Sequence, residues 1–235
     1  MSRRLLAALL CVPLAAPGGT GAEPPRVPVG AKLGAFRLKD TSDNPRSPAD
    51  FRDSKAVVLA FLGIDCPLNT AYMPRLVELA RQYQPKGVAF LGINSNRHDS
   101  LAEVTEHARK FRVPFPVCKD FGNKVADLAG AERTPEVVVL DAAGVIRYRG
   151  RIDDQYGYLP GGQSFQRPAP TRRDLAEALE EILAGKPVSV PETKSDGCLI
   201  ARERPVTDAE AVTYTRDVAP IIQKRCLECH REGQI

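Results

Sequence analysis

The chain has 235 residues, enough for one domain of ordinary size with additional segments. Hydrophobic residues make up 43% of it, a fraction that suits a globular core. The formal net charge is only +4, both signs are interspersed, and no basic stripe with interleaved aromatic residues is present. The composition therefore argues against a nucleic-acid-binding protein.

The first 22 residues have the pattern of a secretory signal peptide. Arg3 and Arg4 are followed by an apolar stretch, Leu5–Ala16, and by the small residues at 20–22. A short membrane anchor is the alternative, but the apolar stretch is too short to span a bilayer comfortably, so no stable membrane span is expected. We predict an exported protein, periplasmic or extracellular, in a setting where disulfides can persist.

A strand–helix–strand unit follows, and one cysteine sits at its first junction. The apolar run Ala56–Leu62 predicts a buried strand. After a three-residue turn come Cys66 and Pro67, and proline is favoured at the first position of a helix. Apolar residues then recur with helical spacing up to Tyr83, and a second apolar strand is expected at Val88–Ile93.

The position of Cys66 has a chemical consequence. A helix N-terminus offers unpaired backbone N–H groups and the positive end of the helix dipole. Both favour a thiolate, which is the nucleophilic form of cysteine. The alternative is a buried structural cysteine.

The elements expected next complete a mixed α/β order. Short strands are expected at 35–40 and 115–118, helices at 100–112, 122–129 and 171–185, and a strand hairpin at 136–140 and 145–149. A long loop rich in Gly and Pro, residues 153–170, precedes the last helix. Such a loop is either functional or a mobile surface insert.

Residues 30–185 resemble the thioredoxin superfamily, and within it the redoxin or peroxiredoxin-like (AhpC/TSA-type) branch. The resemblance rests on FLGIDCP around Cys66, on Pro74 in the following helix, and on Arg133-Thr134-Pro135 before an apolar strand. It implies an α/β thioredoxin-like fold, with a central mixed sheet flanked by helices and an extended C-terminal tail. It also implies that Pro135 is a cis-proline facing the thiol, that Thr134 and Pro135 shape the wall of the site, and that the domain itself needs no cofactor.

Two positions depart from the family pattern. Thioredoxins have a second cysteine three residues after the first, and this chain has Asn69 there, which excludes a local dithiol. Typical peroxiredoxins have Thr or Ser three residues before the reactive cysteine, and this chain has Gly63.

A second thiol would be needed to resolve a sulfenic acid on Cys66. Cys118 lies in an apolar segment and is interpreted as a core residue. Cys198 lies in residues 186–210, which are rich in Pro and charge and are interpreted as a linker or tail. We name Cys198 as the candidate resolving thiol, with a plain tail cysteine as the alternative.

A Cys-x-x-Cys-His motif, the attachment signal of c-type haem, lies near the C-terminal end. Cys226 and Cys229 would bond the porphyrin, and His230 would ligate the iron. Residues 211–235 resemble the opening of the cytochrome c-like modules that are fused to redoxin domains, stopping just past the attachment site. A zinc site and a redox Cys-x-x-Cys are the rival interpretations.

The sequence thus predicts an exported thiol oxidoreductase in which the Cys66 thiolate attacks a peroxide or a protein disulfide and an external thiol reductant restores it. Arg133 either adds positive charge to the site or is a surface residue. Three rivals remain: a thioredoxin-like protein-disulfide reductase, an electron-transfer protein coupled to a fused or partner haem domain, and a redox-inactive binding domain.

Overall fold

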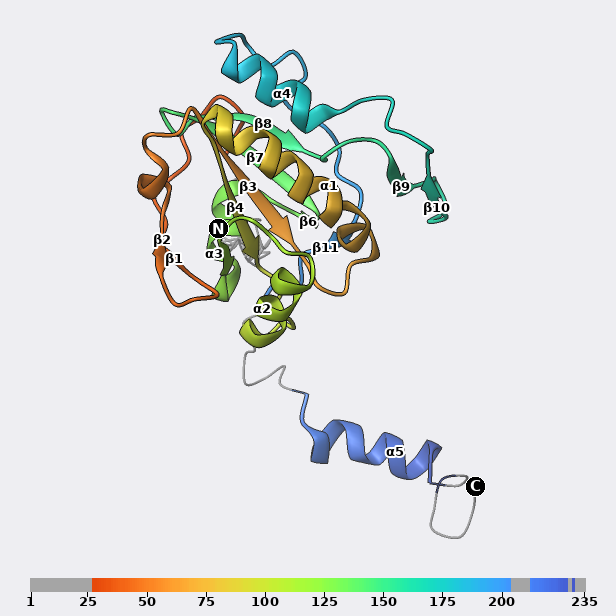
Figure 1. Cartoon of the computed structure of the whole chain (residues 1–235). Helices are drawn as coiled ribbons and strands as arrows, with labels where there is room; N and C mark the ends of the chain where they lie inside the picture. The colour runs from red at the N-terminus through yellow and green to blue at the C-terminus, as the bar shows by residue number, and fades with distance from the viewer. Residues whose placement is uncertain (1–26, 204–211, 228–229, 231–235) are drawn as a thin grey trace, which may run out of the picture.

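The computed structural model describes residues 27–203, 212–227 and 230 of the chain (Figure 1). The predicted signal peptide, residues 1–22, lies outside the described residues. In the part described, no helix is both long enough and apolar enough to cross a bilayer.

A seven-stranded mixed sheet in the order β2-β1-β5-β4-β3-β7-β8 forms the centre of the molecule. Its strands are β1 (Leu38–Asp40), β2 (Pro45–Arg46), β3 (Ala56–Leu62), β4 (Val88–Asn94), β5 (Val117–Lys119), β7 (Glu136–Asp141) and β8 (Ile146–Gly150). All seven residues of β3 are buried because this strand has parallel β4 on one side and antiparallel β7 on the other. The uninterrupted apolar run that predicted this strand is what a central strand covered on both faces requires.

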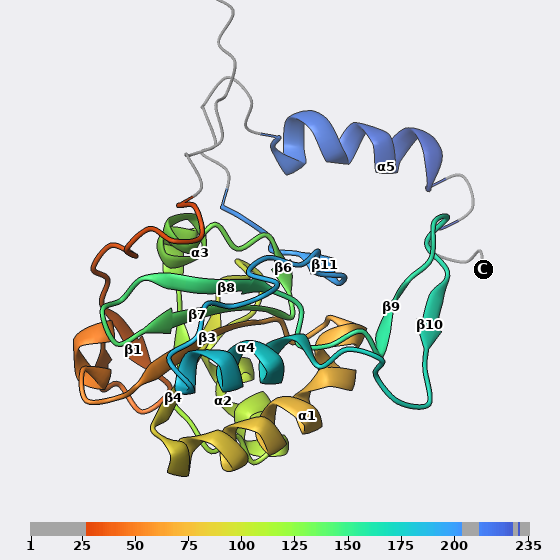
Figure 2. The ribbon, with the colours of Figure 1, turned by 90° about the horizontal axis from the view of Figure 1, so that it is seen from above.

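Helices cover both faces of the sheet, and Figure 2 shows the sheet between them. Helices α1 (Pro67–Tyr83), α2 (Leu101–Lys110) and α4 (Asp174–Leu183) bury residues such as Leu76, Val104 and Leu179 in one core. Helix α3 (Lys124–Ala129) buries Val125 and Ala126 in the core on the opposite face. Short 3-10 turns occur at Pro48–Phe51, Gln84–Lys86 and Phe121–Asn123. The expected α/β fold, a central mixed sheet flanked by helices, is confirmed.

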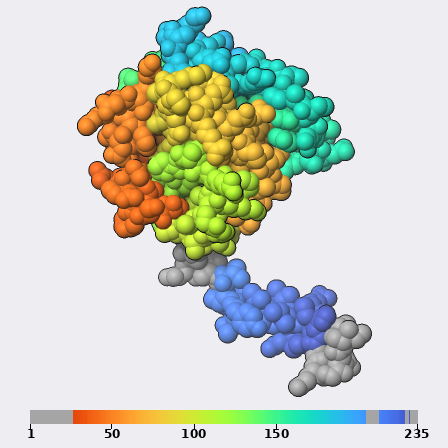
Figure 3. Space-filling model, in the orientation of Figure 1, coloured from red at the N-terminus to blue at the C-terminus, as the bar shows by residue number. Residues whose placement is uncertain are grey.

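The long loop at 153–170 contains a two-stranded hairpin, β9 (Tyr156–Tyr158) and β10 (Ser164–Gln166). Helix α1 anchors its base, since Tyr72 Oη donates to the Asp153 carbonyl at 2.8 Å and Arg75 pairs with the Asp153 carboxylate at 2.7 Å. In the space-filling view, α1 lies at the centre of the face seen and the hairpin lies beside it (Figure 3).

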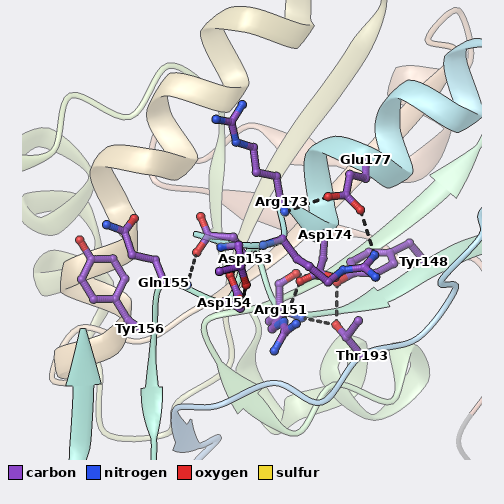
Figure 4. Close-up of polar contacts among 12 residues, drawn as sticks. Tyr148, Arg151, Asp153, Asp154, Gln155, Tyr156, Arg173, Asp174, Glu177 and Thr193 are labelled. Carbon is purple, nitrogen blue, oxygen red and sulfur yellow. Dashed lines mark hydrogen bonds and ion pairs between the residues drawn. The ribbon is translucent and has the colours of Figure 1, made fainter. Parts of the chain in front are cut away.

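Polar contacts tie the end of β8 both to α4 and to the chain that follows α4 (Figure 4). Arg151 Nε donates to Asp174 Oδ2 at 2.7 Å, and Arg151 N donates to Thr193 Oγ1 at 3.1 Å. The Tyr148 and Thr193 hydroxyls lie 2.7 Å apart. Thr193 therefore fixes a point in the segment that leads on to Cys198.

Residues 186–203, which belong to the stretch interpreted as a linker or tail, are bonded to the domain. Thr193 N donates to the Arg149 carbonyl and Ile200 N to the Glu132 carbonyl, at 3.0 and 2.9 Å. The side chain of Ile200 is only 4% exposed. Proline and charge suggested a solvated linker, but backbone bonds to the edge of the domain and one buried isoleucine hold this stretch in place. Beyond it, Tyr214–Val218 and α5 (Ala219–Arg225) are helical.

Candidate active site

Cys66 lies at the junction between β3 and α1. It is the N-cap of α1, with extended backbone angles, and Pro67 occupies the first helical position. Its side chain is buried, with an exposed fraction of 3%. The Cys66 Sγ donates to the Thr134 carbonyl at 2.9 Å, a contact between residues 68 positions apart in the chain.

The wall facing the sulfur is β6 (Arg133–Thr134), followed by Pro135. The Thr134–Pro135 peptide bond is cis, as the family resemblance implied. Thr134 is fully buried, and its Oγ1 has no hydrogen-bond partner among the described residues. The structure therefore brings Thr134 to Cys66, and the cis-proline Pro135 follows Thr134 directly.

Gly63 occupies a crowded position in the turn before Cys66. A Cβ atom there would lie 2.6 Å from Asn96 Nδ2 and 2.7 Å from Thr134 Oγ1. The side chains of Asn96 and Thr134 thus fill the space where typical peroxiredoxins, by the resemblance, have a hydroxyl residue.

Asp99 stabilises the turn that precedes Cys66, and no pattern in the sequence indicated this role. Its Oδ2 accepts from Ile64 N at 3.1 Å, from Asn94 Nδ2 at 2.6 Å and from Asn96 Nδ2 at 3.3 Å. Asn96 Oδ1 also accepts from Ala201 N at 2.9 Å. The chain that follows Cys198 is therefore connected to the turn that precedes Cys66.

Cys198 reaches the site on β11 (Cys198–Leu199), which pairs antiparallel with β6 so that Cys198 lies opposite Thr134. Both cysteines therefore contact the same residue, and both are free thiols. Cys198 is exposed, in contrast to Cys66. Partial burial of the sulfur, then a hydrogen bond to Cys66 and the Cys66 charge, raise the pKa of Cys198 to about 11.

Gly197 and Arg133 set the position of β11. Gly197 has a φ of +139°, and a Cβ atom there would collide with the Thr134 carbonyl oxygen. Arg133 Nη1 donates to the Gly197 carbonyl at 2.7 Å. Arg133 therefore holds this strand in place through a hydrogen bond. Its positive charge also lowers the pKa of Cys198, against the larger effects that raise it. Nothing local in the sequence indicated that Gly197 and Arg133 meet.

The other cysteines lie apart from this pair. Cys118 is fully buried in β5, and burial raises its pKa to about 12, which fits a core residue. Cys226 is exposed and follows α5. Cys229 lies outside the described residues.

The residues beside the predicted haem-attachment motif are exposed in the part of the chain that the structure describes. His230 N donates to the Cys226 carbonyl at 2.9 Å, so the two predicted attachment residues share a turn. However, Ile221 and Leu227 beside them are 62% and 41% exposed, so they form no apolar enclosure. No group of three or more His, Cys, Asp or Glu side chains in the described ranges is arranged to hold a metal ion. Haem attachment at Cys226, Cys229 and His230 stays a prediction.

A buried cysteine at a strand–helix junction, followed across the site by a cis-proline, is typical of the redoxin class of thioredoxin-like proteins. The AhpC/TSA family model matches residues 29–149, which is more than half of the chain. The chain belongs to the AhpC/TSA family.

Relatives of two kinds each match about half of the chain. The thiol-disulfide oxidoreductase ResA of Geobacillus thermodenitrificans is 29% identical over 121 residues, covering 52% of this chain and 68% of that protein. The chloroplastic peroxiredoxin Q of Triticum aestivum is 28% identical over 120 residues, covering 48% of this chain. The chain spans only 54% of the length of that peroxiredoxin.

Solved structures agree on the fold. A hypothetical protein from Sinorhizobium meliloti 1021 superposes with a TM-score of 0.67 at 29% identity, covering 76% of this chain and 97% of that one. The thioredoxin domain of a thiol-disulfide oxidoreductase from Bacteroides vulgatus superposes with a TM-score of 0.50 at 15% identity, covering 67% of this chain and 99% of that one. The fold is thioredoxin-like.

Proposed function

We propose that the protein is an exported two-cysteine peroxidase in which Cys66 reacts with the peroxide and Cys198 resolves the product. The observation that carries the proposal is the placement of both free thiols against Thr134, Cys66 by its hydrogen bond and Cys198 by strand pairing. Export rests on the predicted signal peptide at residues 1–22.

Burial decides which oxidant fits Cys66. With 3% of the residue exposed, a protein disulfide cannot approach its sulfur without moving β11, whereas hydrogen peroxide is hardly larger than water. A small peroxide is therefore the oxidant that the site supports best. A protein disulfide, the alternative substrate, would have to react at the exposed Cys198.

The reaction proceeds in two balanced steps. The Cys66 thiolate attacks one peroxide oxygen, an S–O bond forms, the O–O bond breaks, and the leaving oxygen takes a proton to become water or an alcohol. Cys198 then attacks the sulfur of the Cys66 sulfenic acid, and a disulfide and a water molecule form. A dithiol reductant from outside the chain returns both cysteines to thiols.

The first test treats the reduced protein with one equivalent of hydrogen peroxide, blocks the remaining thiols and maps the peptides by mass spectrometry. We expect a Cys66–Cys198 disulfide in the wild type and sulfenic or sulfinic Cys66 in Cys198→Ser. Cys226→Ser removes a different exposed thiol and is the matched control, which should form the disulfide normally. An unmodified Cys66 would remove the peroxidase assignment and favour a disulfide substrate.

A further inference from the structure

Two buried polar groups in the elements that hold Cys66 have no partner among the described residues. One is the Asn69 side chain, which is 0% exposed and whose Oδ1 and Nδ2 both lack a hydrogen bond. The other is Thr134 Oγ1, on the strand whose carbonyl accepts from the Cys66 sulfur. Buried polar groups in native proteins are nearly always paired, so an unpaired one calls for an explanation.

Asn69 stands where helix geometry brings it near the reactive cysteine. Cys66 is the N-cap of α1 and Asn69 is the third residue of the helix. In a capping box, the side chain at each of these two positions bonds the backbone N–H of the other residue, so the two side chains lie on the same side of the first turn. Here no such side-chain cap bond forms, so the amide of Asn69 keeps its hydrogens free.

The unpaired amide of Asn69 contrasts with the side chain of another buried asparagine, Asn123. Asn123 is 3% exposed, but its Nδ2 donates to the Ser95 carbonyl and its Oδ1 accepts from Glu203 N at 2.8 Å. The fold therefore can satisfy a buried asparagine, and it does not do so at position 69. A leucine would fill that position without an unpaired amide, so packing alone does not account for Asn69.

We infer that Asn69 is a catalytic residue whose Nδ2 donates a hydrogen bond to the peroxide oxygen during oxidation of Cys66, with Thr134 Oγ1 as a second hydrogen-bonding group. Negative charge develops on oxygen as the O–O bond breaks, and a donor fixed in a site without water stabilises that charge strongly. The cost of leaving the amide unpaired in the resting protein is then recovered when the peroxide binds. The inference rests on the proposed function and specifies how the same site holds its substrate.

The test uses the full chain in a Cys198→Ser background, where the sulfenic acid on Cys66 persists. The rate of its formation with hydrogen peroxide is followed by trapping with dimedone and mass spectrometry. We expect Asn69→Leu to lower this rate about 100-fold, as the loss of one oxyanion donor does elsewhere. Asn69→Ser, which restores a short hydrogen-bond donor, should recover part of the rate.

Stability separates this role from a structural one. Removing an unpaired buried amide should leave the denaturant midpoint of Asn69→Leu equal to or above that of the parent. Asn123→Leu, which removes a paired amide of similar burial and also places a leucine at a φ of +58°, should lower the midpoint.

The inference is overturned if Asn69→Leu reacts within twofold of the parent, or if its slow reaction comes with a midpoint as low as that of Asn123→Leu. A different result would disprove the proposed function. If the parent itself forms no sulfenic acid, the peroxidase assignment and this inference both fail, whereas a reactive parent with an equally reactive Asn69→Leu removes only the role of Asn69.

Discussion

At the scale of single residues, the two thiols share one contact residue but differ in accessibility. Cys66 is 3% exposed and sits at the N-terminus of α1, whereas Cys198 is exposed on β11. Once the two sulfurs are joined, an external thiol can reach only the Cys198 sulfur. Attack there makes the Cys66 sulfur the leaving group.

The first prediction concerns which sulfur exchanges. When the oxidised protein is treated briefly with glutathione and quenched with iodoacetamide, we expect glutathione on Cys198 and the alkyl group on Cys66. Peptide mapping by mass spectrometry reads both positions. The reverse pattern, with glutathione on Cys66, would show that the buried sulfur is the accessible one in the oxidised protein.

A second prediction follows from the raised pKa of Cys198, about 11. A raised pKa keeps the proton on the sulfur, so at pH 7–9 little of Cys198 is thiolate and its alkylation should be slow, rising as the pH approaches 11. Two of the causes are the hydrogen bond and the charge of Cys66. Cys66→Ala should therefore lower the pKa and speed the alkylation of Cys198 at pH 8. Equal rates in the two proteins would refute this coupling.

At the scale of elements, the sequence was informative wherever structure is local. The uniform apolar run predicted β3 at Ala56–Leu62, and helical spacing after Pro67 predicted α1 up to Tyr83. The strand β11 escaped prediction because it has two residues, and its register depends on β6, more than sixty positions earlier in the chain. No periodicity or propensity within such a segment can specify a partner that distant.

In the candidate site, too, some features follow from the local sequence and others depend on contacts between distant segments. The position of Cys66 follows from a local strand–turn–helix pattern, and Pro135 follows from the family resemblance. By contrast, two hydrogen bonds form only when separate loops meet in the folded protein. One joins Asp99 to Ile64 in the turn before Cys66, and the other joins Arg133 to Gly197. Cys198 was named as the resolving candidate because it lies in a segment interpreted as a linker or tail, and its strand pairing with Thr134 could not be foreseen from that interpretation.

The third prediction tests whether β11 positions Cys198. In Gly197→Ala, the added Cβ would collide with the Thr134 carbonyl and push β11 away from β6. We expect disulfide formation after peroxide treatment to slow by at least about tenfold, while sulfenic acid forms on Cys66 at the parent rate. Gly185→Ala is the matched control, because Gly185 also has a positive φ, +69°, but nothing lies within 4 Å of its Cβ position. A parent-like rate of disulfide formation in Gly197→Ala would mean that the strand pairing does not control resolution.

At the scale of the whole molecule, the two halves of the site come from opposite ends of the folded domain's sequence. Cys66 follows the central strand, and Cys198 lies in the segment that returns along β8 after the last helix of the domain. Thr193 and Ile200 attach this segment to the sheet edge and to the core. A disulfide between the two cysteines would therefore close a loop containing most of the domain.

The last prediction is that oxidation stabilises the fold. A cross-link that closes a loop of roughly 130 residues lowers the chain entropy of the unfolded state, and native disulfides contribute about 2–4 kcal/mol. The thiols already lie against the same residue, Thr134, so the native state should adapt with little rearrangement. We expect guanidinium unfolding of the peroxide-treated wild type to give a free energy of unfolding about 2–4 kcal/mol above that of the reduced protein. Cys198→Ser should show no gain after the same treatment, and Cys226→Ser should show the full gain. The contrary outcome is an oxidised wild type that has a mapped Cys66–Cys198 disulfide but unfolds at the same midpoint as the reduced protein. Strain in the native state would then cancel the entropic gain, and β11 would have to move when the two sulfurs join.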